Sequence, residues 1–166
     1  AVGATAGLRS WSGSMFEYLM PELIMQTPEA SLIGSSVRSA VDAQIAYGRR
    51  LGVPWGVSES AYNVRDLEFT YQYSPFGVPE LGLKRGLGDN LVVAPYATGL
   101  ASMVVPNAAA ENYQALAALG GCGMYGFYEA VDFTPVRVPQ AERCEVVKAY
   151  MSHHQGMTIV AIANAL

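Results

Sequence analysis

A long stretch without helical character, lying between two helical blocks, limits most strongly what this chain can fold into. Residues 53–90 are rich in glycine, proline, tyrosine and serine and keep no sustained period, so we expect mostly loop there, with short strands or turns. A loop of that length is uncommon in a compact domain unless it has a function. We therefore look for a functional site in this stretch first.

Helical signals dominate on both sides of it. Ser14 and Glu17 have the spacing of a capping box in front of an apolar segment that Pro21 divides. A second helix is expected from Thr27 to Gly52, and others over 95–104, 106–119, 140–152 and 155–166. Paired helices joined by alternating short and long loops, without strand–helix alternation, predict an all-α fold of helical hairpins.

The composition indicates a domain, or a piece of one, whose surface is partly covered by something else. Only 14% of the 166 residues are charged and 51% are hydrophobic, whereas soluble domains carry roughly a quarter charged residues. The cover is the rest of a larger domain, an oligomer partner or a ligand groove. A net charge of −4 without a basic run disfavours a nucleic-acid partner, and no apolar run has the ~18 to 20 residues of a membrane-spanning helix.

A carboxylate among aromatic and small polar residues makes the segment WGVSESAYN at 55–63 a candidate sugar site. Aromatic faces stack on sugar rings, while carboxylates, amides and hydroxyls bind the sugar hydroxyl groups. Glu59 is thus a candidate general acid or base, if its surroundings raise its pKa towards working pH. The structural alternative is a turn or helix-start glutamate that pairs with an arginine.

Two further clusters have polar groups of interest. Glu129, after Tyr128, is a second carboxylate in an aromatic loop, and it can act in catalysis, bind a sugar hydroxyl or anchor the loop. His153 and His154 are neighbours whose side chains point apart on a helix, so hydrogen bonding in a pocket or core is favoured over metal binding. Because no nucleotide-binding motif and no ligand-spaced cluster occurs, we expect neither cofactor nor metal.

Six segments, taken in order, are similar to a single family. They are SWSGSMFEYLMPEL at 10–23, PWGVSESAYN at 54–63, YQYSPFGVPELGLKRGL at 71–87, VVAPYATGLA at 92–101, YGFYEAVDFTP at 125–135 and YMSHHQGM at 150–157. Together they cover nearly the whole chain and resemble the glucoamylase-like domain of bacterial cyclic β-1,2-glucan synthases. More distantly, the WGVSES and YGF segments resemble endo-β-1,2-glucanases.

The resemblance implies that residues 1–166 are a single segment, the partial C-terminal portion of an (α/α)6 barrel built from helical hairpins with long aromatic loops. It implies an enzyme, a glycoside hydrolase or transglycosylase that cyclises linear β-1,2-glucan. Its partners would be a β-glucan chain and the remainder of a larger multidomain synthase on the cytoplasmic side of the bacterial inner membrane. The alternative is a non-catalytic glucan-binding or structural segment of such a membrane-bound synthase.

On this template Glu59 takes the acid/base position. Eight other residues are pocket candidates by motif position: Trp55, Tyr62, Tyr96, Tyr128, Glu129, His153, His154 and Gln155. The family's second catalytic carboxylate is expected in a SEAR-like segment N-terminal to the SWSGSMFEYLMPEL motif, so we expect this chain to contain half of the catalytic pair.

Overall fold

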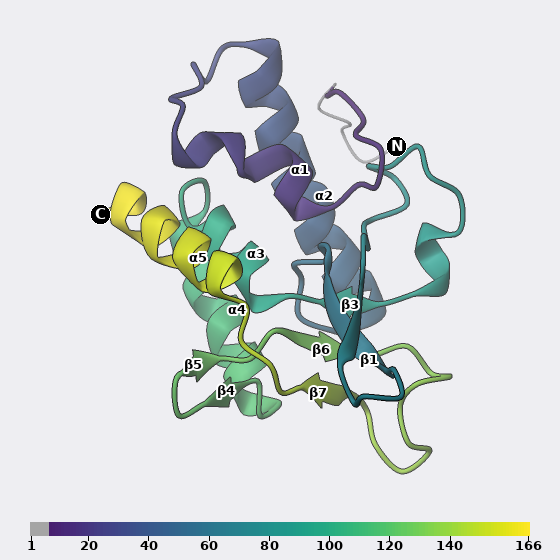
Figure 1. The fold of residues 1–166 in the computed structure, drawn as a ribbon. Helices are drawn as coiled ribbons and strands as arrows, with labels where there is room; N and C mark the ends of the chain where they lie inside the picture. The colour runs from purple at the N-terminus through teal and green to yellow at the C-terminus, as the bar shows by residue number, and fades with distance from the viewer. Residues whose placement is uncertain (1–6) are drawn as a thin grey trace.

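The chain forms five α-helices and seven short strands in the part that the computed structural model describes, residues 7–166 (Figure 1). Residues 1–6 of the predicted single segment lie outside the described residues. The helices are α1 (Met15–Leu19), α2 (Leu32–Leu51), α3 (Pro95–Ala101), α4 (Pro106–Ala118) and α5 (Ser152–Ala165), with 3₁₀ turns η1 (Pro21–Leu23) and η2 (Leu87–Asp89). The strands are β1 (Ser60–Arg65), β2 (Tyr71–Ser74), β3 (Val92–Val93), β4 (Cys122–Gly123), β5 (Gly126–Phe127), β6 (Ala130–Asp132) and β7 (Glu145–Val147).

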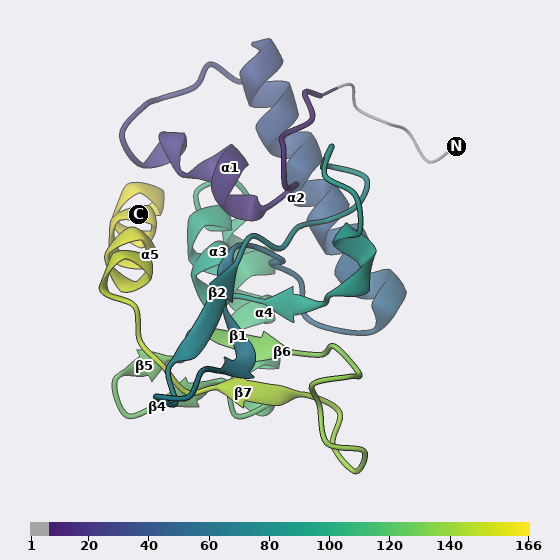
Figure 2. The same cartoon turned by 45° about the vertical axis from the view of Figure 1, so that its right-hand side comes forward.

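Three small antiparallel sheets make the fold mixed α/β, so the prediction of an all-α (α/α)6 barrel segment is wrong. β1 pairs with β2, β4 pairs with β5, and β3, β6 and β7 form a three-stranded sheet in that order. The strands come from the connections between helices, and all except β1 have only two to four residues, too few to show a clear period of two. Once buried, the backbone groups of these connections need partners, and pairing with one another supplies them. Strands β4 to β7 gather at the end of the molecule opposite α1 (Figures 1 and 2).

Several helix ends fall where the sequence predicts them. Ser14 and Glu17 form a complete capping box at the start of α1. Gly52 ends α2 in the left-handed region, at φ 67°, where a side chain would be strained. Pro95 and Pro106 open α3 and α4, because a missing N–H costs nothing in the first helical turn.

Two helical predictions fail. α2 begins at Leu32 with Ser31 as its cap, because the Thr27 hydroxyl bonds to the Glu22 side chain instead of capping a helix. Residues 140–152 were expected to be helical, but they form turns followed by β7. There the backbone is held by the ladder with β6, in which Ala130 lies opposite Val147.

Helix α3 is the centre of the core. All seven of its residues are buried, and it packs against α1, α4 and α5. Small residues allow this close approach: a Cβ added at Gly99 would lie 2.9 Å from Tyr113 Oη and 3.0 Å from Thr158 Cγ2. Because Tyr96 lies on this buried helix, its ring is fixed where residues 53–60 pass over α3.

Candidate functional site

The backbone around Glu59 is fixed on both sides. Buried Gln44 of α2 binds Val57 twice, accepting from its N–H at 2.8 Å and donating to its carbonyl at 2.7 Å. The Ser58 hydroxyl accepts from Phe16 N–H at 3.0 Å and lies 2.8 Å from the Tyr96 hydroxyl. Tyr96 in turn donates to the Glu59 carbonyl at 3.0 Å. Since Tyr96 has one proton, the bond between the two hydroxyls is donated by Ser58.

The Glu59 side chain is partly exposed and bonded to a tyrosine from the neighbouring strand. Tyr73 Oη donates to Glu59 Oε1 at 3.1 Å. The register of the β1–β2 hairpin, with Ala61 opposite Tyr73 and Ser60 opposite Ser74, brings the two side chains together. Glu59 is therefore held by its backbone, while its side chain is partly exposed and its hydrogen bond with Tyr73 is accessible to solvent.

A buried carboxylate–imidazole pair lies behind Tyr73. His154 Nδ1 is 2.9 Å from the Glu129 carboxylate, and the two side chains are 1% and 0% exposed. Glu129 Oε1 also accepts from the Ala61 N–H at 3.2 Å. The His154 ring stacks on Tyr96 with centroids 3.7 Å apart, and its Nε2 is 3.4 Å from Tyr73 Oη.

The environment has clear effects on the titration of two neighbouring groups. Burial and the charge of Glu59 raise the pKa of Tyr73 far above its ordinary value. Burial lowers the pKa of His153, whose ring lies 4.0 Å from that of His154. Tyr73 therefore keeps its proton at neutral pH and acts as a hydrogen-bond donor.

The two carboxyl groups of the cluster differ in exposure: Glu59 is partly exposed, and Glu129 is buried. Glu59 can reach a ligand from solvent, while Glu129 cannot, because its side chain is fully enclosed and already bonded to His154 and Ala61. Direct proton exchange with a substrate is therefore available to Glu59, and Glu129 can act only through its neighbours.

The structure brings Glu59, Tyr96, Glu129, His153 and His154 into one cluster, as the hydrogen bonds and ring contacts show. The remaining predicted residues make contacts elsewhere, and their roles in binding a ligand stay predictions. Tyr62 packs edge-on against Phe76 at 5.3 Å, Tyr128 packs against Tyr150 at 5.1 Å, and Gln155 donates to the Phe127 carbonyl at 3.1 Å.

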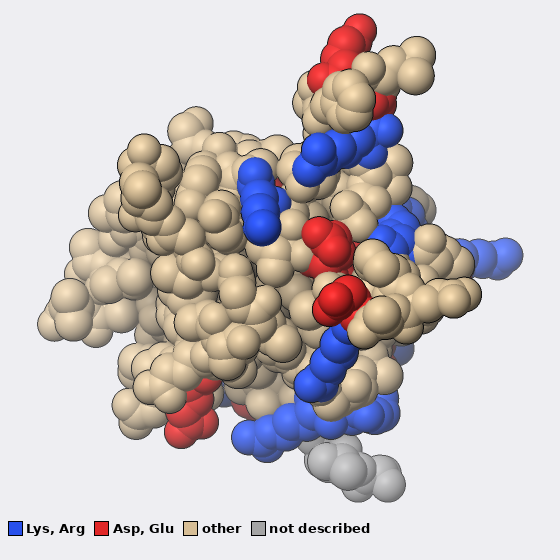
Figure 3. Space-filling view, turned by 90° about the horizontal axis from the view of Figure 1, so that it is seen from below, with Lys and Arg blue, Asp and Glu red and all other residues tan. Residues whose placement is uncertain are grey.

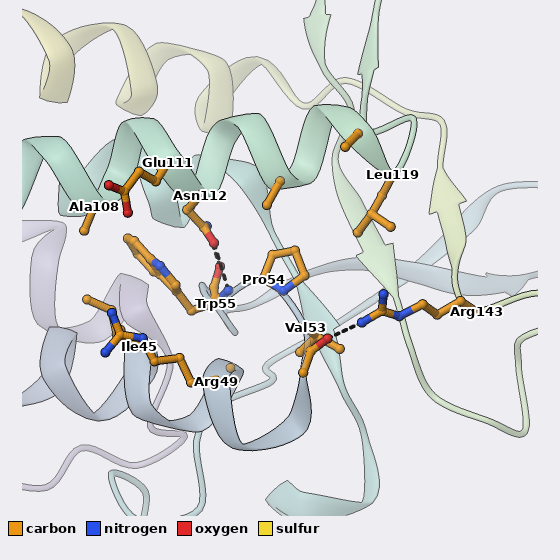
Figure 4. A pocket seen from close by; sticks show the side chains of 14 residues that line it. Ile45, Arg49, Val53, Pro54, Trp55, Ala108, Glu111, Asn112, Leu119 and Arg143 are labelled. Atoms are coloured by element: carbon orange, nitrogen blue, oxygen red, sulfur yellow. Dashed lines mark hydrogen bonds between the residues drawn. The ribbon is translucent and has the colours of Figure 1, made fainter.

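Trp55 lines a different cavity, between α2 and α4 (Figure 4). This cavity has a volume of about 510 Å³ and is also lined by Arg49, Glu111 and Arg143. Asn112 fixes the Trp55 backbone by accepting from its N–H at 3.0 Å and donating to its carbonyl at 2.9 Å. The indole is only 7% exposed, so most of its surface packs against protein.

Sequence reasoning missed Tyr73 and Ser58. Tyr73 lies in the YQYSPFG segment, where no sequence signal distinguishes it from Tyr71; the pairing of this segment with the strand after Glu59 identifies it in the structure. Ser58 lies next to Glu59 in the SES motif, where its hydroxyl orients Tyr96. Across residues 7–166, no group of three or more His, Cys, Asp or Glu side chains is arranged to hold a metal ion.

The chain belongs to the Glycoamylase family, described as putative glucoamylase, which matches residues 1–166. The cyclic beta-(1,2)-glucan synthase NdvB of Rhizobium meliloti (strain 1021) is 54% identical over 165 residues, which are 99% of this chain and 6% of that protein. The chain thus spans 6% of the length of this curated relative. These matches confirm the family resemblance predicted from the six segments.

Solved structures share the fold. The putative glucoamylase of Bacteroides caccae ATCC 43185 is 17% identical with a TM-score of 0.64, over 98% of this chain and 41% of that chain. The endo-beta-1,2-glucanase of Chitinophaga pinensis, solved with sophorotriose and glucose, is 16% identical with a TM-score of 0.60, over 94% of this chain and 36% of that chain. At these sequence identities, the structural similarity shows that the chain shares the fold of these two proteins.

Proposed function

We propose that this chain is part of a glycoside hydrolase or transglycosylase module that acts on β-1,2-glucan and cyclises linear chains within a larger synthase. We further propose that Glu59 is its general acid and base. The observation that carries the proposal is a solvent-accessible carboxyl group whose backbone is fixed by Tyr96 and whose Oε1 is bonded to Tyr73. The names of the synthase and of the glucanase support β-1,2-glucan as the substrate.

The proposed chemistry is a double displacement that retains configuration. Protonated Glu59 donates to the glycosidic oxygen as the C–O bond breaks, and a second carboxylate attacks the anomeric carbon to form a glycosyl–enzyme bond. The Glu59 carboxylate then removes a proton from the free 2-hydroxyl at the other end of the same glucan, whose oxygen displaces the enzyme carboxylate. A ring closes, and Glu59 regains its proton.

The attacking carboxylate is not Glu129. Retaining enzymes keep the two carboxyl groups about 5–5.5 Å apart with both open to the sugar, and the Glu129 side chain is 0% exposed. By the family resemblance, we propose that this carboxylate belongs to a SEAR-like segment N-terminal to residue 10.

Surface properties support a place within a larger protein. Large apolar side chains are exposed after η1, at the start of α2 and on α5, with Ile24 84%, Leu32 59% and Ile159 69% accessible. Exposed apolar surface is where a domain contacts another protein or another part of the same protein. The face in Figure 3 likewise has a broad area without charged side chains. None of the helices within residues 7–166 is long and apolar enough to cross a membrane. By the family resemblance, we propose that the larger protein places this module on the cytoplasmic side of the bacterial inner membrane.

The test uses the full-length protein that contains this segment, supplied with linear β-1,2-glucan. We expect products without a reducing end, detected by mass spectrometry after reductive labelling of all remaining ends. Glu59→Gln should slow the formation of these products about 10²–10⁴-fold and keep glucan binding. The matched control Glu80→Gln, at an exposed ion pair with Arg50, should behave as wild type. Full turnover by Glu59→Gln would disprove the acid/base role. Binding without turnover in the wild type would identify a non-catalytic glucan-binding segment.

A further inference from the structure

Tyr73 faces two hydrogen-bond acceptors and has one proton to donate. Its hydroxyl oxygen lies 3.1 Å from Glu59 Oε1 and 3.4 Å from His154 Nε2. A phenol rotates its O–H at little cost, so the proton can point towards either group. Which group accepts depends on the charge that each one has.

His154 presents Nε2 to Tyr73 because its other nitrogen is held. Glu129 accepts from the Ala61 N–H through Oε1 at 3.2 Å, and its carboxylate lies 2.9 Å from His154 Nδ1. An ionised carboxylate can only accept, so this contact places the imidazole proton on Nδ1 and leaves the lone pair of a neutral ring on Nε2. Stacking on Tyr96, with ring planes 10° apart, keeps the imidazole in this orientation.

We propose that Tyr73 is a positioning residue whose hydroxyl proton turns between His154 and Glu59 as Glu59 gains and loses its own proton. This inference rests on the proposed function. While Glu59 is a carboxylic acid, Tyr73 donates to His154 Nε2, and the Glu59 proton is free for the glycosidic oxygen. After that proton has moved to the leaving group, Tyr73 donates to the Glu59 carboxylate. Tyr73 and His154 keep their own protons throughout.

The second acceptor matters because it supports the acid form of Glu59. A donor that bonds only to the carboxylate stabilises the charged form and depletes the acid form needed for the first step. With His154 available, Tyr73 is hydrogen-bonded in both states. Besides Glu59 and Glu129, the ionisable groups that face this cluster are His153, whose ring lies 4.0 Å from that of His154, and Tyr96.

Two substitutions should shift the pH dependence of kcat/KM in opposite directions. Tyr73→Phe removes the donor to the carboxylate, so the basic limb, set by loss of the Glu59 proton, should move up by about one pH unit. In Glu129→Gln the amide oxygen keeps the Ala61 N–H bond, and the amide NH₂ faces His154 Nδ1. The imidazole proton then moves to Nε2, Tyr73 stays bonded to Glu59, and the limb should move down.

The measurement is kcat/KM for linear β-1,2-glucan between pH 4 and pH 9 in the full-length protein. Tyr71→Phe is the matched control, because Tyr71 lies on the same strand and its hydroxyl is bonded by Arg65. We expect the control profile to be unchanged. In Tyr73→Phe, the additional Glu129→Gln substitution should lose most of its downward effect, since that effect passes through the Tyr73 hydroxyl.

An unchanged basic limb in Tyr73→Phe would overturn the inference, as would shifts of both variants in the same direction. The Tyr73 side chain is 42% exposed, so Tyr73→Phe decides the question even if the buried Glu129→Gln substitution prevents folding. Failure of the proposed function would look different: Glu59→Gln would then retain turnover, whatever the Tyr73 variants do.

Discussion

Removing the Asp132 carboxylate should destabilise the sheets that position the site. Asp132 on β6 is fully buried and accepts from Arg137 Nε at 2.7 Å, from Thr134 N–H at 3.0 Å and from Asn63 N–H at 3.1 Å. It thereby joins β6 to β1, the strand that follows Glu59. In Asp132→Ala, the guanidinium of Arg137, whose side chain is 12% exposed, and two backbone donors lose their acceptor.

The loss of stability expected for Asp132→Ala follows from the burial of the Asp132–Arg137 ion pair. Removing one partner of a buried ion pair costs about 3–5 kcal/mol, a large part of the roughly 5–15 kcal/mol by which a domain is stable. With an m-value of about 2 kcal/mol per molar urea, the unfolding midpoint should fall by roughly 2 M. Circular dichroism during urea titration of the purified protein measures this midpoint.

An exposed ion pair provides the control. Arg50 and Glu80 are 2.8 Å apart, close to the 2.7 Å of the Asp132–Arg137 pair, but their side chains are 55% and 52% exposed. Glu80→Ala should therefore change the free energy of unfolding by less than about 1 kcal/mol. If Asp132→Ala cost no more than Glu80→Ala, the reasoning that burial makes this ion pair important would be refuted.

Three further predictions concern stability. Burial raises the pKa of Glu17, but hydrogen bonds from Ser12 and Ser14 outweigh it and hold the pKa below its ordinary 4.5. Glu17 therefore stabilises the fold above its unfolded-state pKa and loses this effect as the pH falls through its lower folded-state pKa. In Glu17→Gln, the free energy of unfolding should fall less steeply towards acid pH than in the wild type. An equally steep fall in both proteins would count against this role of Glu17. Gly77→Ala should lower the free energy of unfolding by about 2 kcal/mol or more, because the added Cβ would overlap the Ser12 carbonyl. Gly156→Ala, at an open position on the surface of α5, should raise it by about 0.5–1 kcal/mol. Thermal melts of both variants measure these changes.

The helices could be predicted largely from their ends. Capping residues, prolines in the first turn and Gly52 act locally, so the residues themselves contain the information. The strands could not, because β3, β4 and β5 are only two residues long. β4 and β5 pair with each other in a tight hairpin, and β3 exists only through its pairing with β6, which is distant in sequence. The helix expected over 140–152 failed for the same reason: pairing with β6 overrides local preference there.

The candidate site was partly predictable. Glu59, Glu129 and His154 each stood out as polar groups among aromatic and small residues, and the fold brings them together. Tyr73, which links them, was indistinguishable from neighbouring tyrosines until the β1–β2 register was known. Conversely, Trp55 lies close to Glu59 in sequence, but its indole packs between α2 and α4, because the backbone turns at Gly56, where φ is 113°.

Substrates with different leaving groups test most directly whether Glu59 transfers the proton to the leaving group. For Glu59→Gln in the full-length protein, we predict that kcat on linear β-1,2-glucan falls about 10²–10⁴-fold. On a 4-nitrophenyl glycoside of a β-1,2-gluco-oligosaccharide, whose leaving group departs without protonation, the first step should be nearly unaffected and a burst of nitrophenol should appear. Equal losses in that first step for both substrates, or no loss for either, would contradict the assignment of Glu59.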